Sequence, residues 1–349
     1  RAGFQMSGSN DFFGYSAGYG SVSSAPYGSG QQNVGIGTNA LYNLSTGDSN
    51  TAVGRSAGQS VTTGTGNTLV GKSSGDAITS AEYNTAVGVG SLGAMTTGGN
   101  NNTALGAFAA SSINDTDAIE NVAIGAYAGA GGAGALKRTV AIGMNALNST
   151  GTADVIGAVA IGYNALTAAN NTNIDYSVGI GHSSLQALQS GQHNVGVGFQ
   201  SLTSTNGGQF NVAMGSEAGK FNVTGTGNIF MGYQTGRGAF GNSHDYNVGI
   251  GYQALYNVTT GDNNIAIGSS AGNDITTGGS NVLLGHQAGD NITTKTGVIA
   301  IGSGAAGAIS TTGDYTIAIG HGAMGGAEIG DGNIAIGYQS MQNANAAGF

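Results

Sequence analysis

The sequence predicts an all-β, repetitive fold: a β-solenoid or β-roll of about eighteen coils. A short unit recurs at spacings of 17, 18 or 19 residues, as in NVGIGYQALYNVTTGDN (247–263), which is followed at once by NIAIGSSAGNDITTGGS. Glycine contributes 68 of the 349 residues, which disfavours long helices. Apolar residues alternate with Ala or Gly at the start of each copy, with the two-residue period of a strand. No copy can bury its apolar residues alone, so the copies must stack.

A glycine marks the same place in every copy. We number the repeat from its first Asn, so that Asn247 is at position 1, Gly251 at position 5 and Asp262 at position 16. An invariant Gly at position 5 predicts a turn with positive φ, or a place with no room for a Cβ. Longer copies carry their extra residues in the polar tail, which predicts an exposed loop that tolerates insertion. These turn glycines include Gly37, Gly54, Gly71, Gly125, Gly143, Gly251, Gly268 and Gly337.

The strand of each copy has two different faces. Positions 2 and 4 are apolar in nearly every copy, whereas position 3 is usually Ala or Gly. We predict that positions 2 and 4 fill the core and that the small-residue face points outward, where identical chains pack against it. The alternative is that small residues merely keep a tight strand flat. The predicted core includes Val122, Ile124, Val140, Ile142, Ile265, Ile267, Ile334 and Ile336.

Two further positions have a predicted structural role. Asn at position 1 can stack coil over coil as a side-chain amide ladder. Where it is replaced, as at Thr139 and Val298, the ladder should break without unravelling the fold. Position 8 is Ala, Ser or Thr and is predicted to face inward.

The chain divides into a lead-in and a repeat domain. Residues 1–32 form an irregular N-terminal lead-in with a degenerate first coil, and residues 33–349 form one continuous solenoid. The sequence begins at Arg1 rather than Met, so we expect a mature fragment or an interior piece of a longer protein.

Composition argues against several function classes. The formal net charge is −9 with only eight Lys and Arg, so no basic patch is available for nucleic acid. Without Cys there are no disulfides and no thiolate metal sites. No apolar run reaches the ~20 residues of a membrane span, so membrane insertion is not expected.

Motifs that resemble functional sites fall on repeat positions. The pattern GxxxxGK[ST] at Gly66–Ser73 joins a tail glycine to a position-5 glycine, and another copy follows where a phosphate loop needs a helix. His182, His286 and His321 share position 6 with tyrosines. Asp48 in a TGD tail is predicted to accept backbone hydrogen bonds in a turn. We therefore predict no catalytic residue, no cofactor and no metal site, and no enzymatic activity.

Tyrosines at position 6 are the candidates for surface recognition. Aromatic faces stack on sugar rings, and Tyr is common at recognition surfaces. Filling of space between coils explains them equally well. The candidates are Tyr163, Tyr233, Tyr252 and Tyr338.

The repeats resemble those of known fibres. NTAVGRSAG, NVAIGAYAG, NIAIGSSAG and NVGIGYQALYNVTTGDNNIAIG are similar to the repeats of bacteriophage tail fibres that precede a self-cleaving intramolecular chaperone. They also resemble the shorter NSVAIG-type head repeats of YadA-like trimeric autotransporter adhesins. The resemblance covers residues 10–349, but the chaperone domain and a heptad stalk are absent from this sequence.

The resemblance implies a parallel homotrimeric fibre that reaches and grips a cell surface. The expected function is that of a structural protein: the shaft or receptor-contacting rod of a phage tail fibre, located in the virion. Its partners would be itself and a host-surface glycan or protein. A bacterial extracellular adhesin or surface filament subunit is the alternative. An ice-binding solenoid, which the TTG tails would favour, is a further one.

Overall fold

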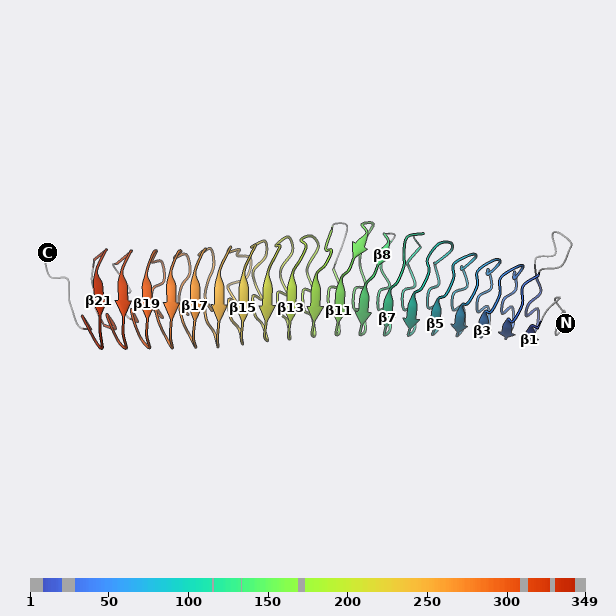
Figure 1. Cartoon of the computed structure of the whole chain (residues 1–349), viewed down its shortest axis with the longest axis horizontal. Coiled ribbons are helices and arrows are strands. Elements are labelled where there is room, and N and C mark those ends of the chain that lie inside the picture. Colours follow the sequence, from blue (N-terminus) through green and yellow to red (C-terminus); the bar gives the residue numbers. More distant parts are fainter. Residues whose placement is uncertain are drawn as a thin grey trace. The chain divides into compact units, whose positions relative to one another are not determined.

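Both parts of the chain are stacks of short parallel strands. The computed structural model describes residues 9–20, 29–114, 116–132, 134–168, 173–307, 313–326 and 330–342, and none of these ranges contains a helix. The chain divides into two compact units, Arg1–Ser177 and Val178–Phe349. Within each unit the strands lie side by side in one row, and the segments between them return on the other side (Figure 1). The predicted all-β solenoid is therefore confirmed, whereas the number of chains that assemble stays a prediction.

Strand pairing in the first unit joins equal repeat positions. Thr51, for example, lies opposite Thr68, and the paired strands of this unit run parallel. A small second ladder joins two tails, between β8 (Leu136–Lys137) and β10 (Val155–Ile156). The main strands are β1 (Asp11–Phe13), β2 (Val34–Ile36), β3 (Thr51–Val53), β4 (Thr68–Val70), β5 (Thr85–Val87), β6 (Thr103–Leu105), β7 (Val122–Ile124), β9 (Val140–Ile142) and β11 (Val159–Ile161).

The second unit repeats this arrangement with fewer irregularities. Val248 lies opposite Ile265, and the same register holds from β12 to β21. The strands are β12 (Val178–Ile180), β13 (Val195–Val197), β14 (Val212–Met214), β15 (Ile229–Met231), β16 (Val248–Ile250), β17 (Ile265–Ile267), β18 (Val282–Leu284), β19 (Ile299–Ile301), β20 (Ile317–Ile319) and β21 (Ile334–Ile336).

The strand faces are the reverse of the prediction. Position 3 points into the coil, where Ala123 is only 2% exposed. Positions 2 and 4 point outward, and at the last strand Ile334 and Ile336 are 62% and 67% exposed. The prediction that positions 2 and 4 form the core was therefore wrong for all eight residues, which are half-buried or exposed: Val122, Ile124, Val140, Ile142, Ile265, Ile267, Ile334 and Ile336.

The small residues face inward because the coil is thin. The wall opposite the strand supplies the large side chains from positions 9 and 12, such as Leu255 and Val258, both fully buried. Ala or Gly at position 3 leaves room for them. Where position 3 is large, as at Leu69, position 9 is Gly in the same and the preceding coil. A Cβ on Gly58 or Gly75 would lie 2.8 or 2.7 Å from a methyl carbon of Leu69.

Buried asparagines at position 1 form the predicted amide ladder. The Nδ2 of Asn67 donates to Oδ1 of Asn50 (3.0 Å) and to the carbonyl of Ala81 (2.9 Å). Oδ1 of Asn67 accepts hydrogen bonds from the backbone N (3.1 Å) and Nδ2 (3.2 Å) of Asn84. Each amide thus satisfies its own polar atoms and a neighbour's backbone, which a buried position requires.

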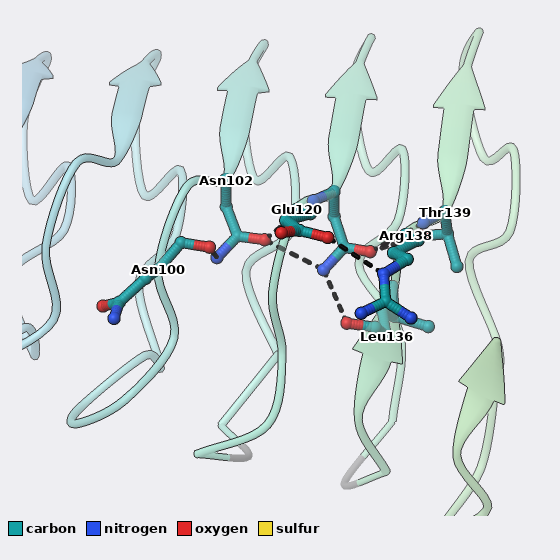
Figure 2. Close-up of polar contacts among 7 residues, drawn as sticks. Asn100, Asn102, Glu120, Leu136, Arg138 and Thr139 are labelled. Carbon is teal, nitrogen blue, oxygen red and sulfur yellow. Dashed lines mark hydrogen bonds and ion pairs between the residues drawn. The ribbon is translucent and has the colours of Figure 1, made fainter. Parts of the chain in front are cut away.

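The ladder also ends as predicted, without loss of strand pairing. Figure 2 shows one end, where Thr139 follows the asparagines of two earlier coils. The Nδ2 of Asn121 donates to Oδ1 of Asn102 (2.9 Å), and its own Oδ1 accepts from the backbone N and Oγ1 of Thr139 (2.9 and 2.8 Å). The strands β7 and β9 remain paired across this step.

Position-5 glycines have positive φ and, apart from Gly337 in the last coil, those described have no room for a side chain. Gly251 has φ +131°, and a Cβ on it would lie 2.6 Å from the carbonyl oxygen of Gly268 in the next coil. Both expected reasons for glycine therefore apply at once. Non-glycine residues also adopt left-handed φ in each coil, as at Gln253 (φ 52°) and Leu255 (φ 53°) at positions 7 and 9. The φ values of the predicted turn glycines lie between 123° and 139°: Gly37, Gly54, Gly71, Gly125, Gly143, Gly251, Gly268 and Gly337.

Candidate recognition surfaces

The outer strand face of the second unit is apolar throughout. Every residue at positions 2 and 4 from β12 to β21 is Val, Ile, Leu or Met. At a strand spacing of about 4.8 Å, this surface extends over roughly 45 Å. In the first unit, position 2 is Thr in four successive coils, β3 to β6, while position 4 stays apolar. An exposed apolar surface this continuous is typical of a protein interface.

The predicted tyrosines at position 6 are exposed and stack between coils. Tyr233 and Tyr252 have ring centroids 5.5 Å apart and planes 14° apart. Tyr338 stacks on His321 at 5.4 Å. Tyr163 is likewise exposed. The rings therefore fill space between neighbouring coils and still present surface to solvent, so both hypotheses for them remain in place.

A second row of exposed aromatic residues was missed. It occupies position 17, the last residue before position 1 of the next copy. In longer copies, we count the last three residues before that point as positions 15 to 17. Tyr246 has φ 55°, and its ring lies on the backbone of Gly227 one coil earlier, where a Cβ would be 2.7 Å from the ring. A glycine one repeat before the aromatic residue is the signal that could have found this row. The same pairs are Tyr83 with Gly66, Tyr176 with Gly157 and Tyr315 with Gly297.

Glu217 organises a charged cluster that sequence reasoning also missed. One of its oxygens pairs with Lys220 Nζ at 2.8 Å, and the other accepts from Arg237 Nε at 3.0 Å and from Gln234 Nε2 at 2.9 Å. Burial alone would raise the pKa of Glu217, but hydrogen bonds from Lys220, Gln234 and Arg237 outweigh it and lower that pKa to about 2. The carboxylate is therefore ionised at neutral pH and fixes both cations.

Two aromatic rings lie next to the cations of this cluster, and a third packs against one of them. The guanidinium carbon of Arg237 lies 4.7 Å from the ring centre of Phe221 and 5.5 Å from that of Tyr256. Phe240, in the insertion of its coil, meets Phe221 edge-on at 5.9 Å and is 82% exposed. Cations held over ring faces are stabilised by the ring quadrupole, which favours this arrangement.

Turn aspartates cap the backbone of the preceding coil, as predicted for the TGD tails. Oδ1 of Asp48 accepts the backbone N–H of Gln31 at 2.6 Å. Oδ1 of Asp262 accepts that of Asp245 at 2.7 Å. These carboxylates therefore have a structural role.

The histidines form no shared site. Across the described ranges, no group of three or more His, Cys, Asp or Glu residues could hold a metal ion. His244, which lies in a polar tail, is only 1% exposed and packs edge-on against Phe230. Burial lowers the pKa of His244 to about 4, so the ring is neutral at pH 7.

The phosphate-loop pattern at Gly66–Ser73 has the wrong surroundings. Its middle residues form strand β4, and Gly71 is an ordinary position-5 turn with φ +134°. The residues that follow in this coil are turns, so no helix N-terminus is available for a phosphate.

Within the described part of the chain, no helix is long and apolar enough to cross a bilayer. No protein-family model matches the chain, and comparison with curated proteins gives no match.

Proposed function

We propose that this chain is a structural segment of a self-associating fibre, and that it serves as the shaft of a phage tail fibre that contacts the host surface. The observation that carries the proposal is the apolar outer face of the strands. Its residues would be stabilised by about 25 cal/mol for each Å² removed from water. A row of ten strands thus offers a large association energy.

The corrected strand orientation changes which face associates. Position 3 is inside the coil, so the Ala and Gly residues cannot meet another chain. The Val and Ile residues at positions 2 and 4 take that role in the proposal. Three parallel chains around one axis would each bury one such face, and the resemblance of the repeats to trimeric fibres supports this number.

A mechanical role agrees with the way the coils are built. Buried asparagines and backbone hydrogen bonds connect each coil to the next in the same register, as between Asn247 and Asn264. Such a stack resists local opening because every coil is supported on two sides. We propose that it holds a receptor-contacting surface away from the particle rather than performing catalysis.

The ice-binding alternative is weaker. Its flat array needs free threonine hydroxyls, but those at position 13 are used internally. Oγ1 of Thr62 donates to the carbonyl of Thr79, and Oγ1 of Thr259 donates to that of Thr276.

The mass of the particle in solution tests the assembly. We expect native mass spectrometry or light scattering to give three times the chain mass of 34.0 kDa. The double variant Ile250→Lys/Ile267→Lys should release single chains, because it places charges on the apolar face. The matched control, Thr260→Lys/Thr277→Lys, adds the same charges at exposed tail positions and should keep the wild-type mass. Circular dichroism verifies that both variants remain β-structured.

A wild-type protein that is monomeric at micromolar concentration would overturn the proposal. A dimer or tetramer sensitive to the same substitutions would retain association through this face and reject the number three. The host-contacting role is tested by binding of the labelled protein to bacterial cells, which should saturate and be blocked by unlabelled protein.

A further inference from the structure

We propose that Arg237, together with Phe221, Phe240 and Tyr256, forms a binding site for an acidic sugar, that is, a pyranose bearing a carboxylate. This deepens the proposed function by naming the chemistry of the host surface, and it rests on that function. The site lies wholly within the second unit.

The guanidinium group of Arg237 is positioned to bind a ligand. Arg237 uses Nε to donate to Glu217 at 3.0 Å, and its guanidinium carbon lies 4.7 Å from the ring centre of Phe221 and 5.5 Å from that of Tyr256. In the region that the structure describes, its two Nη groups donate no hydrogen bond to the protein. A planar pair of Nη donors matches the two oxygens of a carboxylate, and little side-chain entropy remains to be lost on binding.

The aromatic rings favour a sugar over a simple anion. Phe240 is 82% exposed and meets Phe221 edge-on, so an exposed apolar ring lies next to the ring that the guanidinium contacts. The C–H face of a pyranose packs against such rings. A ligand with both a carboxylate and an apolar ring face would thus use both parts of the site.

Local charge attracts an anion although the chain is acidic. Lys220 and Arg237 outnumber Glu217 within the cluster, which leaves a net charge of about +1. Lys220 Nζ is bound to Glu217 at 2.8 Å and lies 5.2 Å from the ring centre of Phe221, so its positive charge is part of the cluster. The whole chain carries −9, and the cluster is a local exception.

The position of the site is compatible with assembly through the strand face. Glu217, Lys220 and Phe221 follow β14, Arg237 and Phe240 follow β15, and Tyr256 follows β16, so none belongs to a strand. Phe240 belongs to the residues that lengthen its coil beyond the 17-residue unit. Burial of the strand face by sister chains would leave this insertion available.

Titration with defined oligosaccharides tests the proposal on the full chain. The probes are a glucuronic-acid disaccharide, a sialic-acid-terminated trisaccharide, their neutral counterparts without the carboxylate, and sodium acetate. We expect saturation-transfer NMR and calorimetry to show binding of at least one acidic sugar, with at least tenfold weaker binding of its neutral counterpart and of acetate.

Variants separate the roles of the residues. Arg237→Lys keeps the charge but loses the planar pair of donors, and Phe240→Ala removes the exposed ring; each should weaken acidic-sugar binding at least tenfold. Lys295→Gln, which removes a charge elsewhere in the same unit, is the control and should bind normally. Equal binding of acidic and neutral sugars, binding of acetate as tight as of the sugars, unchanged affinity in Arg237→Lys, or no binding of any probe would each overturn the proposal. The solution mass of every variant should stay that of the wild type, so failure here is distinguishable from failure of the assembly.

Discussion

Leu283 occupies the space that a side chain at Gly289 would need. A Cβ on Gly289 would lie 2.6 Å from one methyl carbon of Leu283, and a Cβ on Gly272 would lie 2.7 Å from the other. The two walls of the coil thus compete for volume, because a large residue at position 3 leaves room only for Gly at position 9. Ala266 and Leu255, at those positions in neighbouring coils, show the opposite choice.

This shared volume predicts a compensating pair of substitutions. Leu283→Ala should lower the free energy of unfolding by about 2–5 kcal/mol because it opens a cavity. Gly289→Leu alone should cost about 1–3 kcal/mol through overpacking. The double variant should be more stable than the sum of the two effects, since leucine already adopts left-handed φ at position 9, as Leu255 does. Guanidinium denaturation measures all three, and strictly additive effects would contradict the volume argument.

Removal of one ladder asparagine should destabilise three coils together. Asn67→Ala leaves the backbone N and Nδ2 of Asn84 and the carbonyl of Ala81 without their partners. We expect a loss of about 2–4 kcal/mol, because each buried orphan group costs about 1–3 kcal/mol. Asn67→Thr should cost less, as the Thr139 hydroxyl and N–H still reach the preceding amide. Hydrogen exchange would show faster exchange confined to the neighbouring coils, and a uniform change across the chain would argue against this local coupling.

A methyl group at position 5 should be tolerated far less well than one at position 7. Gly251→Ala places a Cβ 2.6 Å from the Gly268 carbonyl oxygen in a backbone with φ +131°. The control Gly304→Ala has φ +65° and meets nothing within 4 Å. We expect a loss of about 1 kcal/mol for the control and at least about 3 kcal/mol for Gly251→Ala. Similar melting temperatures for the two variants would show that the coils separate easily at this corner.

Stability should fall in mild acid because of His244. The folded-state pKa is about 4 and the ordinary value 6.5, so below pH 6.5 the unfolded state binds a proton that the folded state rejects. The free energy of unfolding should therefore decrease as the pH falls from about 6.5 to 4, by an amount on the order of 3 kcal/mol, and this contribution should level off below pH 4. Denaturation curves at several pH values test this.

His244→Leu supplies the comparison for that titration. Its side chain cannot titrate, and no hydrogen bond is lost at Nε2, which has no partner within the described structure. The variant should lack this pH dependence, whereas His193→Asn, at an exposed ring stacked on Phe210, should keep it. Identical slopes for wild type and His244→Leu would assign the effect to other groups.

The repeat made the backbone predictable. Glycine recurs at position 5 of every copy and Asn at position 1 of most copies, and the residue type alone indicates the physical reason: positive φ and no room for a Cβ at Gly251, and a self-complementary amide at Asn67. Stacking in register then follows, because any other register would separate the position-1 asparagines from one another and the position-5 glycines from one another.

The inward face was not predicted because the bulk of a side chain was taken as the sign of burial. The sequence does contain a pattern that indicates an inward-facing position 3. Large residues at position 3 coincide with Gly at position 9: Leu69, Phe230 and Leu283 do so in two successive coils, and Phe12 does so with Gly18 of its own coil. Such compensation is needed only between residues that share an interior.

The cluster around Arg237 could not be found from residue types. Glu217, Arg237 and Tyr256 are separated by about one repeat each, and nothing in their own sequence contexts marks them. Only the stacking of three coils brings positions 7 and 10 together, so the chemistry of the cluster depends on register rather than on a motif.

The hydrogen-bonding groups of each coil pair with the coil before it and the coil after it. The stack therefore requires no particular number of coils. Tandem duplication of one whole repeat would insert a coil whose hydrogen bonds the neighbouring coils can make. Deletion of one repeat would likewise leave no hydrogen-bonding group without a partner. The length of the stack can therefore change by recombination between similar repeats, independently of any change in the residues around Arg237.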